Sequence, residues 1–404
     1  MRNVVIGMVI GVVVGVVIGA TVIAPRLTTD STTPERKAQA SVVIARQVEK
    51  PQPQTKAEAV ITAHTQQAQE EPDTAITGLE PEAGAVRWVM ASAYPSAMPQ
   101  IGAMAKRLER EIWRISAGNM DIKFHEPGTL VDIKEMFNAV ASGAIDAAFS
   151  WPGHWSGSIP ALGLFAAVPF GPYAEEYLAW IYFGGGKELF ESIYHPQGVH
   201  GVFCGMAPAE ASGWFRRKIR VPEDLKGLKI RFSGLGGKVL GKLGAEIKNL
   251  EGGDIFAAFE SGDIEAAEFS MPAIDLKLGF YKMAKHYYFP GWHQPATLLE
   301  LLINLKLWEE LPATARSQIE GVCGDNIRYG LAEGGAAQFQ ALKELSAKGV
   351  EIHRWPTEVL DALEEAWMEV SAEEQTADRD FRRVWKSLSA FRRNYAIWNE
   401  LGRL

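Results

Sequence analysis

Hydrophobic and polar residues follow two different rhythms along the middle of the chain. Val-Arg-Trp-Val-Met-Ala at 86–91 alternates with the period of two that is typical of a strand. The segment 99–116 instead carries apolar residues at intervals of three and four, which predicts an amphipathic helix. The same patterns predict further strands at 120–124, 145–149, 199–206 and 229–232, and further helices at 132–142 and 237–243. Strands that alternate with helices are typical of parallel sheets covered by helices on both faces.

One short pattern occurs twice, at 137–148 and at 256–267, and eight of its twelve positions match in identity or charge type. Each copy reads as the end of a helix, then a glycine suited to the left-handed conformation (Gly143 or Gly262), then a buried strand. The repetition predicts two α/β lobes of similar design, although a chance match between Ala-rich segments is the alternative. Ligands bind beyond the carboxyl ends of strands in such sheets, so we expect 149–151 and 268–270 to face a shared cleft.

These patterns predict an α/β chain with parallel-rich sheets, a hinge cleft between two lobes, and long C-terminal helices. We expect lobe I at 85–208, together with part of 300–355, and lobe II at 209–299. The charged, helically periodic residues at 356–404 predict C-terminal helices that lie over the lobes.

The N-terminal region differs from the rest of the chain. Residues 4–24 carry no charge and are long enough to span a bilayer, with glycine at every fourth position from Gly7 to Gly19. We interpret 1–24 as a membrane anchor, with a cleaved signal segment as the alternative; either would export the chain. Residues 25–84 contain no aromatic residue and are rich in Thr, Gln, Glu, Ala and Pro, which predicts a disordered tether.

Composition narrows the classes of function. The 404 residues are 47% hydrophobic and carry a net charge of −8, which argues against nucleic-acid binding. Cys204 and Cys323 could form one disulfide or remain as two buried thiols. Nucleophile-elbow, phosphate-loop and zinc-protease motifs are missing from the sequence, and the glycines at 234–237 are interpreted as a turn that leads into a helix.

Several residues are candidates for binding a ligand. Arg231 lies near the carboxyl end of a predicted strand, where it could hold a carboxylate with two parallel hydrogen bonds or pair with a nearby Glu. Glu210 and Glu268 lie among small or apolar residues, where a carboxylate is usually paired or helps to hold a cation. The aromatic segment 286–295 could line a pocket or belong to the core, and Trp151 begins a weaker group of the same kind.

The folded part of the chain, about 86–398, resembles the solute-binding subunits of TRAP (tripartite ATP-independent periplasmic) transporters. The motifs that carry the resemblance are Ser-Gly-Trp-Phe-Arg at 212–216, Asp-Leu-Lys-Gly-Leu-Lys-Ile-Arg at 224–231, Leu-Gly-Phe-Tyr-Lys at 278–282, Tyr-Tyr-Phe-Pro-Gly-Trp at 287–292 and Phe-Arg-Arg-Val-Trp at 381–385. The resemblance implies a fold like that of periplasmic binding proteins. The branch that this chain resembles most binds 2-oxo or 2-hydroxy monocarboxylates, often with a cation.

The resemblance also assigns roles to individual residues. Arg231 falls at the arginine that holds the substrate carboxylate. Glu210 falls where the branch has a Gln that touches both ligand and metal, and Gln294 falls where it has a metal-binding Glu, so these two side chains look exchanged. Phe269 replaces a Trp and is a candidate for both substrate and metal contact. The metal implied is Na⁺ or Ca²⁺.

Trp151 and Trp292 complete the candidate substrate site, while the residues at 270–275 depart from the family's pattern. The resemblance implies a periplasmic receptor without catalytic activity, which delivers a small organic acid to the membrane subunits of a TRAP permease. We expect the N-terminal helix to hold the receptor at the inner membrane, and a homodimer is left open.

Two other classes of function remain as alternatives. One is a membrane-anchored ectodomain that senses a ligand without transport. The other is an exported hydrolase that uses Glu210 and Glu268, against which the missing nucleophile motif argues.

Overall fold

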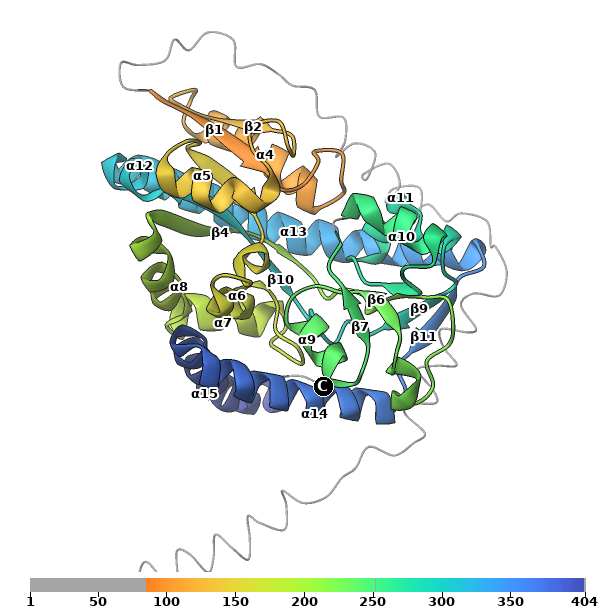
Figure 1. Ribbon diagram of the computed structural model, residues 1–404. Coiled ribbons are helices and arrows are strands. Elements are labelled where there is room, and N and C mark those ends of the chain that lie inside the picture. The colour runs from red at the N-terminus through yellow and green to blue at the C-terminus, as the bar shows by residue number, and fades with distance from the viewer. Residues whose placement is uncertain (1–84, 251, 403–404) are drawn as a thin grey trace, which may run out of the picture. The chain divides into compact units, whose positions relative to one another are not determined.

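Two mixed β-sheets with helices packed around them make up the part of the chain that the structure describes (Figure 1). This computed structural model describes residues 85–250 and 252–402. The predicted anchor at 1–24 and the predicted tether at 25–84 lie outside the described residues. The alternation of strands and helices confirms the α/β prediction.

The first sheet has the strand order β2-β1-β3-β10-β4. β1 pairs in parallel with β2 and β3, whereas β10 runs antiparallel to both of its neighbours, β3 and β4. Its strands are β1 (Val86–Ser92), β2 (Met120–His125), β3 (Ala147–Ser150), β4 (Val199–Ala207) and β10 (Thr297–Asn304).

The second sheet has the order β11-β9-β5-β8-β6-β7, and here β5 is the strand that runs antiparallel to both neighbours. β6 pairs in parallel with β7 and β8, and β9 with β11. Its strands are β5 (Gly213–Phe215), β6 (Lys229–Arg231), β7 (Glu246–Lys248), β8 (Ala266–Ala267), β9 (His286–Phe289) and β11 (Glu351–Arg354).

The two antiparallel strands have a common origin in the path of the chain. β4 leads directly to β5 through 208–212, and β9 leads directly to β10 through 290–296, with no α-helix between the strands of either pair. Each of these connections carries the chain from one sheet to the other. The crossover helix of a βαβ unit makes its two strands run parallel. A strand that is not preceded by such a helix has no such constraint on its direction. The alternation of helices and strands therefore predicted parallel pairing, whereas the structure has antiparallel pairing at β5 and β10.

The repeated sequence pattern occupies equivalent places in the two sheets. Helix α5 (Met136–Ser142) ends at Gly143 and helix α10 (Ile255–Ser261) ends at Gly262, with φ of 76° and 79°. β3 and β8 follow these glycines, and each lies between a parallel neighbour and the antiparallel strand of its sheet. The structure thus confirms the helix–glycine–strand prediction for both copies.

Helices cover the two sheets and connect them (Figure 1). The long helix α13 packs on β4 and α4 along one part of its length and on α11 along another; α14 packs on α9, and α15 packs on α7 and α8. The predicted long C-terminal helices are confirmed by α14 and α15. The α-helices are α4 (Ile101–Ile115), α5, α6 (Gly163–Ala166), α7 (Ala174–Phe183), α8 (Gly186–Tyr194), α9 (Gly234–Lys242), α10, α11 (Pro272–Leu278), α12 (Leu305–Glu310), α13 (Ala313–Ala347), α14 (Thr357–Ala377) and α15 (Arg379–Leu401).

A disulfide joins Cys204 on β4 to Cys323 on α13. Both residues are fully buried, so the alternative of two buried thiols correctly anticipated their burial but was wrong about their chemistry. The bond attaches α13 to the first sheet, and disulfides persist in oxidising compartments outside the cytoplasm.

Candidate functional site

Arg231, at the end of β6, is held by the segments that follow β7 and β8. Its Nη1 donates to Glu268 Oε2 over 2.9 Å and also to the Glu268 carbonyl, while its Nε donates to the Leu250 carbonyl over 3.1 Å. The guanidinium lies 5.6 Å from the centre of the Phe269 ring. With its side chain 12% exposed, Arg231 is not a surface residue, although it does pair with a nearby Glu as the alternative predicted.

Glu210 is positioned by contacts between the two connections that cross from sheet to sheet. It lies in 208–212, and its N–H donates to the Gln294 carbonyl in 290–296 over 3.1 Å. Gly291 donates back to the Glu210 carbonyl over 2.9 Å. A Cβ atom at Gly291 would lie 2.3 Å from that carbonyl oxygen, so the close approach of the two segments requires a glycine there.

The Glu210 side chain is buried, and only one of its two carboxylate oxygens accepts hydrogen bonds from the described residues. Its Oε1 accepts hydrogen bonds from Thr297 Oγ1 over 3.1 Å and from Ser270 Oγ over 3.4 Å. Gln294 Nε2 donates to the same Thr297 hydroxyl over 2.9 Å, so the two side chains that look exchanged share one partner. Glu210 Oε2 is buried without a hydrogen-bond partner among the described residues. Burial, together with the charge of Glu268, raises the pKa of Glu210 well above its ordinary value.

Acidic groups outnumber basic ones around this carboxylate. Ligand atoms of Glu210, Glu268 and His293 all lie within 4.8 Å of one another. Burial opposes ionisation of Glu268, but His293 and Arg231 outweigh it and hold the pKa of Glu268 below its ordinary value. His293 Nε2 is 3.6 Å from Glu268 Oε1, and neither ring nitrogen of His293 has a hydrogen-bond partner among the described residues. Two buried carboxylates and one imidazole thus lie close together, and the Arg231 guanidinium pairs with one of the carboxylates, Glu268.

Asp275 adds a third buried carboxyl group nearby. Burial raises its pKa to about 7, against the opposing effect of hydrogen bonds that its Oδ2 accepts from Trp214 and Tyr287. The rings of Trp214 and Tyr287 stack with their centres 3.9 Å apart, and both are fully buried. Tyr287, in the strand part of the aromatic segment 286–295, therefore belongs to the core of the second sheet.

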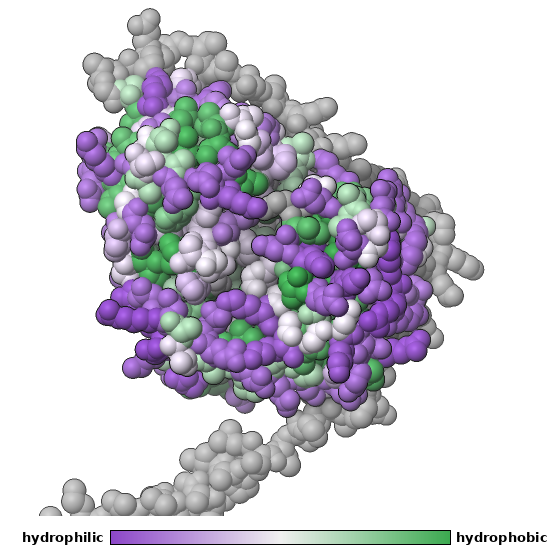
Figure 2. Space-filling view, viewed as in Figure 1, coloured by the Kyte–Doolittle hydropathy of each residue, from purple (hydrophilic) through white to green (hydrophobic). Residues whose placement is uncertain are grey.

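The last part of the aromatic segment reaches the region between the sheets. His293 and Gln294 line a small, partly open cavity of about 10 Å³, together with Trp151 and residues 233–236. That volume is roughly what one water molecule needs. The face seen in Figure 2 is hollowed between the elements of the two sheets, where residues of intermediate hydropathy gather.

Two tryptophans predicted to contact substrate lie differently. Trp151 follows β3 and lines the cavity, whereas Trp292 stacks on Phe170 and Phe232 at ring-centre distances of 5.6 and 6.0 Å and is 3% exposed. The indole N–H groups of Trp151 and Trp292 are buried without a hydrogen-bond partner among the described residues. Buried donors are normally paired, so both mark a place where polar partners are missing.

The structure brings Arg231, Glu210 and Gln294 into one region through Glu268, which was itself a candidate from the sequence, and through Thr297, which was not. Glu268 connects Arg231 to the acidic cluster, and Thr297 connects Glu210 to Gln294. Among the candidate metal contacts, Phe269 could contribute only through its main-chain carbonyl, because its side chain has no donor atom. His293 was also missed, although its place between Trp292 and Gln294 was a usable signal.

Residues 90–377 match the family model of DctP, the bacterial extracellular solute-binding proteins of family 7. The chain belongs to the DctP family. This family consists of solute receptors located outside the cytoplasm and is not a class of enzymes. Among the residues described, no helix combines the length and apolar character needed to cross a membrane.

Individual relatives of this DctP chain are similar over most of their length. A monocarboxylate 2-oxoacid-binding periplasmic protein of Nostoc sp. is 32% identical over 320 residues, which are 79% of this chain and 87% of that protein. A TRAP transporter solute-binding protein from Bordetella bronchiseptica, solved with copurified calcium and picolinate, is 31% identical, with a TM-score of 0.76 over 80% of this chain and 95% of that one.

A third DctP relative is a TRAP periplasmic solute-binding protein from Pseudoalteromonas atlantica, solved with sodium and pyruvate. It is 30% identical, with a TM-score of 0.73 over 78% of this chain and 96% of that one. The family and these relatives confirm the resemblance to TRAP solute-binding subunits. They give no support to the alternative of a sensory ectodomain uncoupled from transport.

Proposed function

We propose that this DctP protein binds a small 2-oxo or 2-hydroxy monocarboxylate together with a cation, and releases it to the membrane subunits of a TRAP permease. The observation that carries the proposal is the buried excess of carboxylates beside Arg231. An organic anion would add a further negative charge to Glu210 and Glu268, so anion binding there needs a compensating cation. The family and the relatives that bind pyruvate, picolinate or 2-oxoacids support the same ligand class.

Arg231 would hold the ligand carboxylate. A guanidinium has five N–H donors in a rigid fork, and the bonds to Glu268 and Leu250 use those on Nε and Nη1. These bonds fix the plane of the fork, so that Nη2 can meet a carboxylate without a further loss of side-chain entropy.

Oxygen atoms would hold the cation. Na⁺ and Ca²⁺ prefer carboxylate and carbonyl oxygens, which Glu210, Glu268 and the amide oxygen of Gln294 can supply. The unpartnered Oε2 of Glu210 fits this role, because a cation would satisfy an atom that is otherwise costly to bury. Phe269 would contribute its main-chain carbonyl, and His293 would orient Glu268 rather than bind a hard cation.

Binding should require the cavity to open. The cavity beside His293 and Gln294 has a volume of about 10 Å³, which is too small for a three-carbon acid, so we expect the elements around it to separate when the ligand enters. Trp151 from the first sheet and residues 233–236 beside the second lie on opposite sides of this movement. Specificity then comes from positioned polar groups in a closed site, and we propose no catalytic step.

The ligand class can be tested by thermal unfolding of the purified full chain. Pyruvate or lactate together with Ca²⁺ or Na⁺ should raise the midpoint of unfolding more than the acid or the cation alone, because each stabilises the folded state and offsets the charge of the other. Mass spectrometry of copurified small molecules would identify the natural ligand. Equal shifts with and without the cation would contradict the proposed cation role, and no shift with any monocarboxylate would contradict the ligand class.

We also propose that residues 1–24 remain on the protein and hold it at the inner membrane, facing the periplasm. The uncharged segment 4–24 has spanning length, and Ala24 is followed by Pro25, a poor cleavage position. The protein should sediment with membranes and be released only by detergent. A mature N-terminus at Thr21 or beyond would show instead that the segment is a signal peptide. Homodimerisation remains a prediction.

A further inference from the structure

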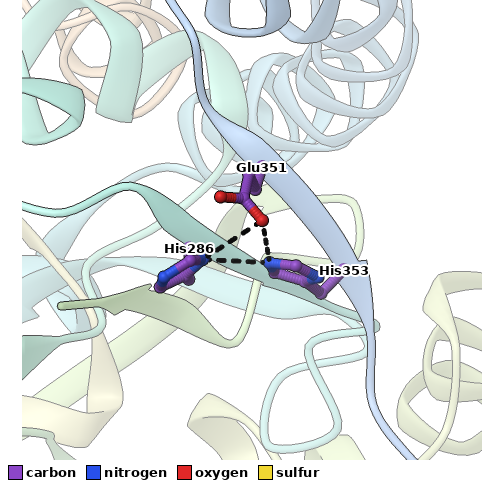
Figure 3. A group of neighbouring side chains, drawn as sticks. All are labelled: His286, Glu351 and His353. Carbon is purple, nitrogen blue, oxygen red and sulfur yellow. Dashed lines mark hydrogen bonds and ion pairs between the residues drawn. The ribbon is translucent and has the colours of Figure 1, made fainter. Parts of the chain in front are cut away.

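A second group of potential metal ligands lies on the second sheet, among residues that take no part in the proposed carboxylate site. It comprises His286 at the start of β9, and Glu351 and His353 on β11 (Figure 3). One atom from each of the three lies within 4.8 Å of the other two.

Strand register explains why these three side chains meet. β9 and β11 are parallel, and His286 is aligned directly with Glu351. His353 is two residues beyond Glu351, and side chains at that spacing project from the same face of a sheet. β11 is also the edge strand, which leaves the group accessible to solvent: the side chains are 14%, 51% and 22% exposed for His286, Glu351 and His353.

The separations suit a tetrahedral metal ion. His286 Nδ1 is 3.1 Å from His353 Nε2, and Glu351 Oε2 is 3.7 Å from each of these nitrogens. Zinc binds imidazole nitrogen at about 2.0–2.1 Å, so two ligands of a tetrahedral site lie about 3.3 Å apart. Figure 3 shows the two rings and the carboxylate converging on one small region.

The donor types select a transition metal over a hard cation. Two imidazoles and one carboxylate suit Zn²⁺ and its neighbours, whereas Ca²⁺ and Mg²⁺ prefer sites made entirely of oxygen. The His353 ring lies 4.9 Å from the Tyr288 ring, which restrains its orientation. We propose that His286, Glu351 and His353 bind Zn²⁺, with water as the fourth ligand.

Lys218 is the competitor for this site. Its Nζ is 2.6 Å from Glu351 Oε2, the same oxygen that would bind the metal. Both side chains are about half exposed, at 40% and 51%, and such ion pairs contribute little to stability. Lys218 can therefore move into solvent when the metal enters, and its charge lowers the affinity of the site. A bound ion would tie the edge strand β11 to β9 and protect it from fraying.

The test is calorimetric titration of Zn²⁺ into the metal-free full chain without a histidine tag. A His293→Gln background removes the imidazole of the carboxylate site as a competing ligand, and excess Ca²⁺ saturates that site's oxygens. One Zn²⁺ should bind per chain, and it should raise the thermal midpoint of unfolding. His353→Gln should weaken binding by roughly tenfold or more, since even loss of a residue that only orients a ligand costs that much.

Two matched variants keep the test decisive. Lys218→Ala should raise the affinity for Zn²⁺, which a general loss of structure could not do. His195→Gln should leave it unchanged, because His195 and His200 lie 2.9 Å apart without belonging to a three-ligand group among the described residues. Co²⁺ should show the absorption of a tetrahedral site. The proposal is overturned if Zn²⁺ does not bind at micromolar protein concentration, or if it binds equally well after His353→Gln.

Discussion

Arg231→Ala is expected to lower the affinity for the carboxylate ligand by roughly tenfold to a hundredfold, since a hydrogen bond to a charged group contributes about 1.5–3 kcal/mol. The substitution removes the guanidinium that is proposed to bind the ligand carboxylate. The Arg231 side chain that carries it is only 12% exposed. Isothermal titration with pyruvate in excess Ca²⁺ would measure the loss.

The same substitution should also destabilise the ligand-free protein, because Glu268 would lose its 2.9 Å ion pair and remain buried. Arg231→Lys separates the two effects. A lysine can restore the charge beside Glu268, but its ammonium cannot make the planar set of bonds to Glu268 and Leu250 while also presenting a donor to the ligand carboxylate as Nη2 does. We expect Arg231→Lys to recover more of the unfolding free energy than of the ligand affinity. An Arg231→Ala protein that is folded and binds pyruvate as tightly as the parent would remove Arg231 from the site.

Glu210→Gln is expected to affect stability differently with and without a cation. Without one, the substitution replaces a buried carboxylate that has an unpartnered oxygen and a raised pKa, so the free energy of unfolding should stay the same or increase. When a cation is present, it should stabilise the variant less than it stabilises the parent. At a cation concentration 100 times the parent's dissociation constant, a tenfold loss of affinity would reduce the stabilisation from about 2.7 to about 1.4 kcal/mol.

Glu300 supplies the matched control for this measurement. It is a fully buried carboxyl group whose pKa burial raises to about 7, but its two oxygens accept hydrogen bonds from Ser150, Trp155 and Tyr194. Glu300→Gln should cost stability and leave the cation-dependent gain unchanged. Denaturant titrations with and without Ca²⁺ or Na⁺ would decide the matter. An equal gain in the parent and in Glu210→Gln would show that Glu210 does not hold the cation.

Short-range pattern was sufficient for much of the fold. The spacing of apolar residues identifies β1 and α4, because a half-buried strand buries every second side chain whereas an amphipathic helix buries side chains three and four residues apart. The two copies of the helix–glycine–strand unit were readable for a similar reason, since a left-handed residue at Gly143 or Gly262 is a local requirement of the backbone. Motifs in a fixed order were likewise enough to identify the family.

Strand direction could not be predicted in the same way. β5 and β10 run antiparallel to their neighbours because the chain enters each of them from the other sheet. A strand's own residues encode its burial and its period, but they do not encode which sheet the preceding strand belongs to. The pairing of Cys204 with Cys323 could not be predicted from local sequence either, because β4 and α13 are brought together only when the first sheet has formed.

The proposed carboxylate site likewise combines residues that the local sequence indicates with contacts that only the tertiary structure provides. Arg231 and Glu210 were recognisable from motif position and from their small or apolar neighbours. Their connection through Glu268 and Thr297 depends on two crossing segments whose backbones hydrogen-bond to each other, far apart in the chain.

The His286, Glu351 and His353 group is the clearest case of what tertiary structure decided. Nothing in the segments around 286 or 351 indicates a metal site, because each supplies only one or two ligand atoms. The parallel register of β9 and β11 places the three on one face. Register is set by the packing of the whole sheet against its helices, whereas the period of each strand is set by its own residues. Local sequence therefore specified the elements and indicated two of the proposed binding residues, and the packing between elements specified which groups meet.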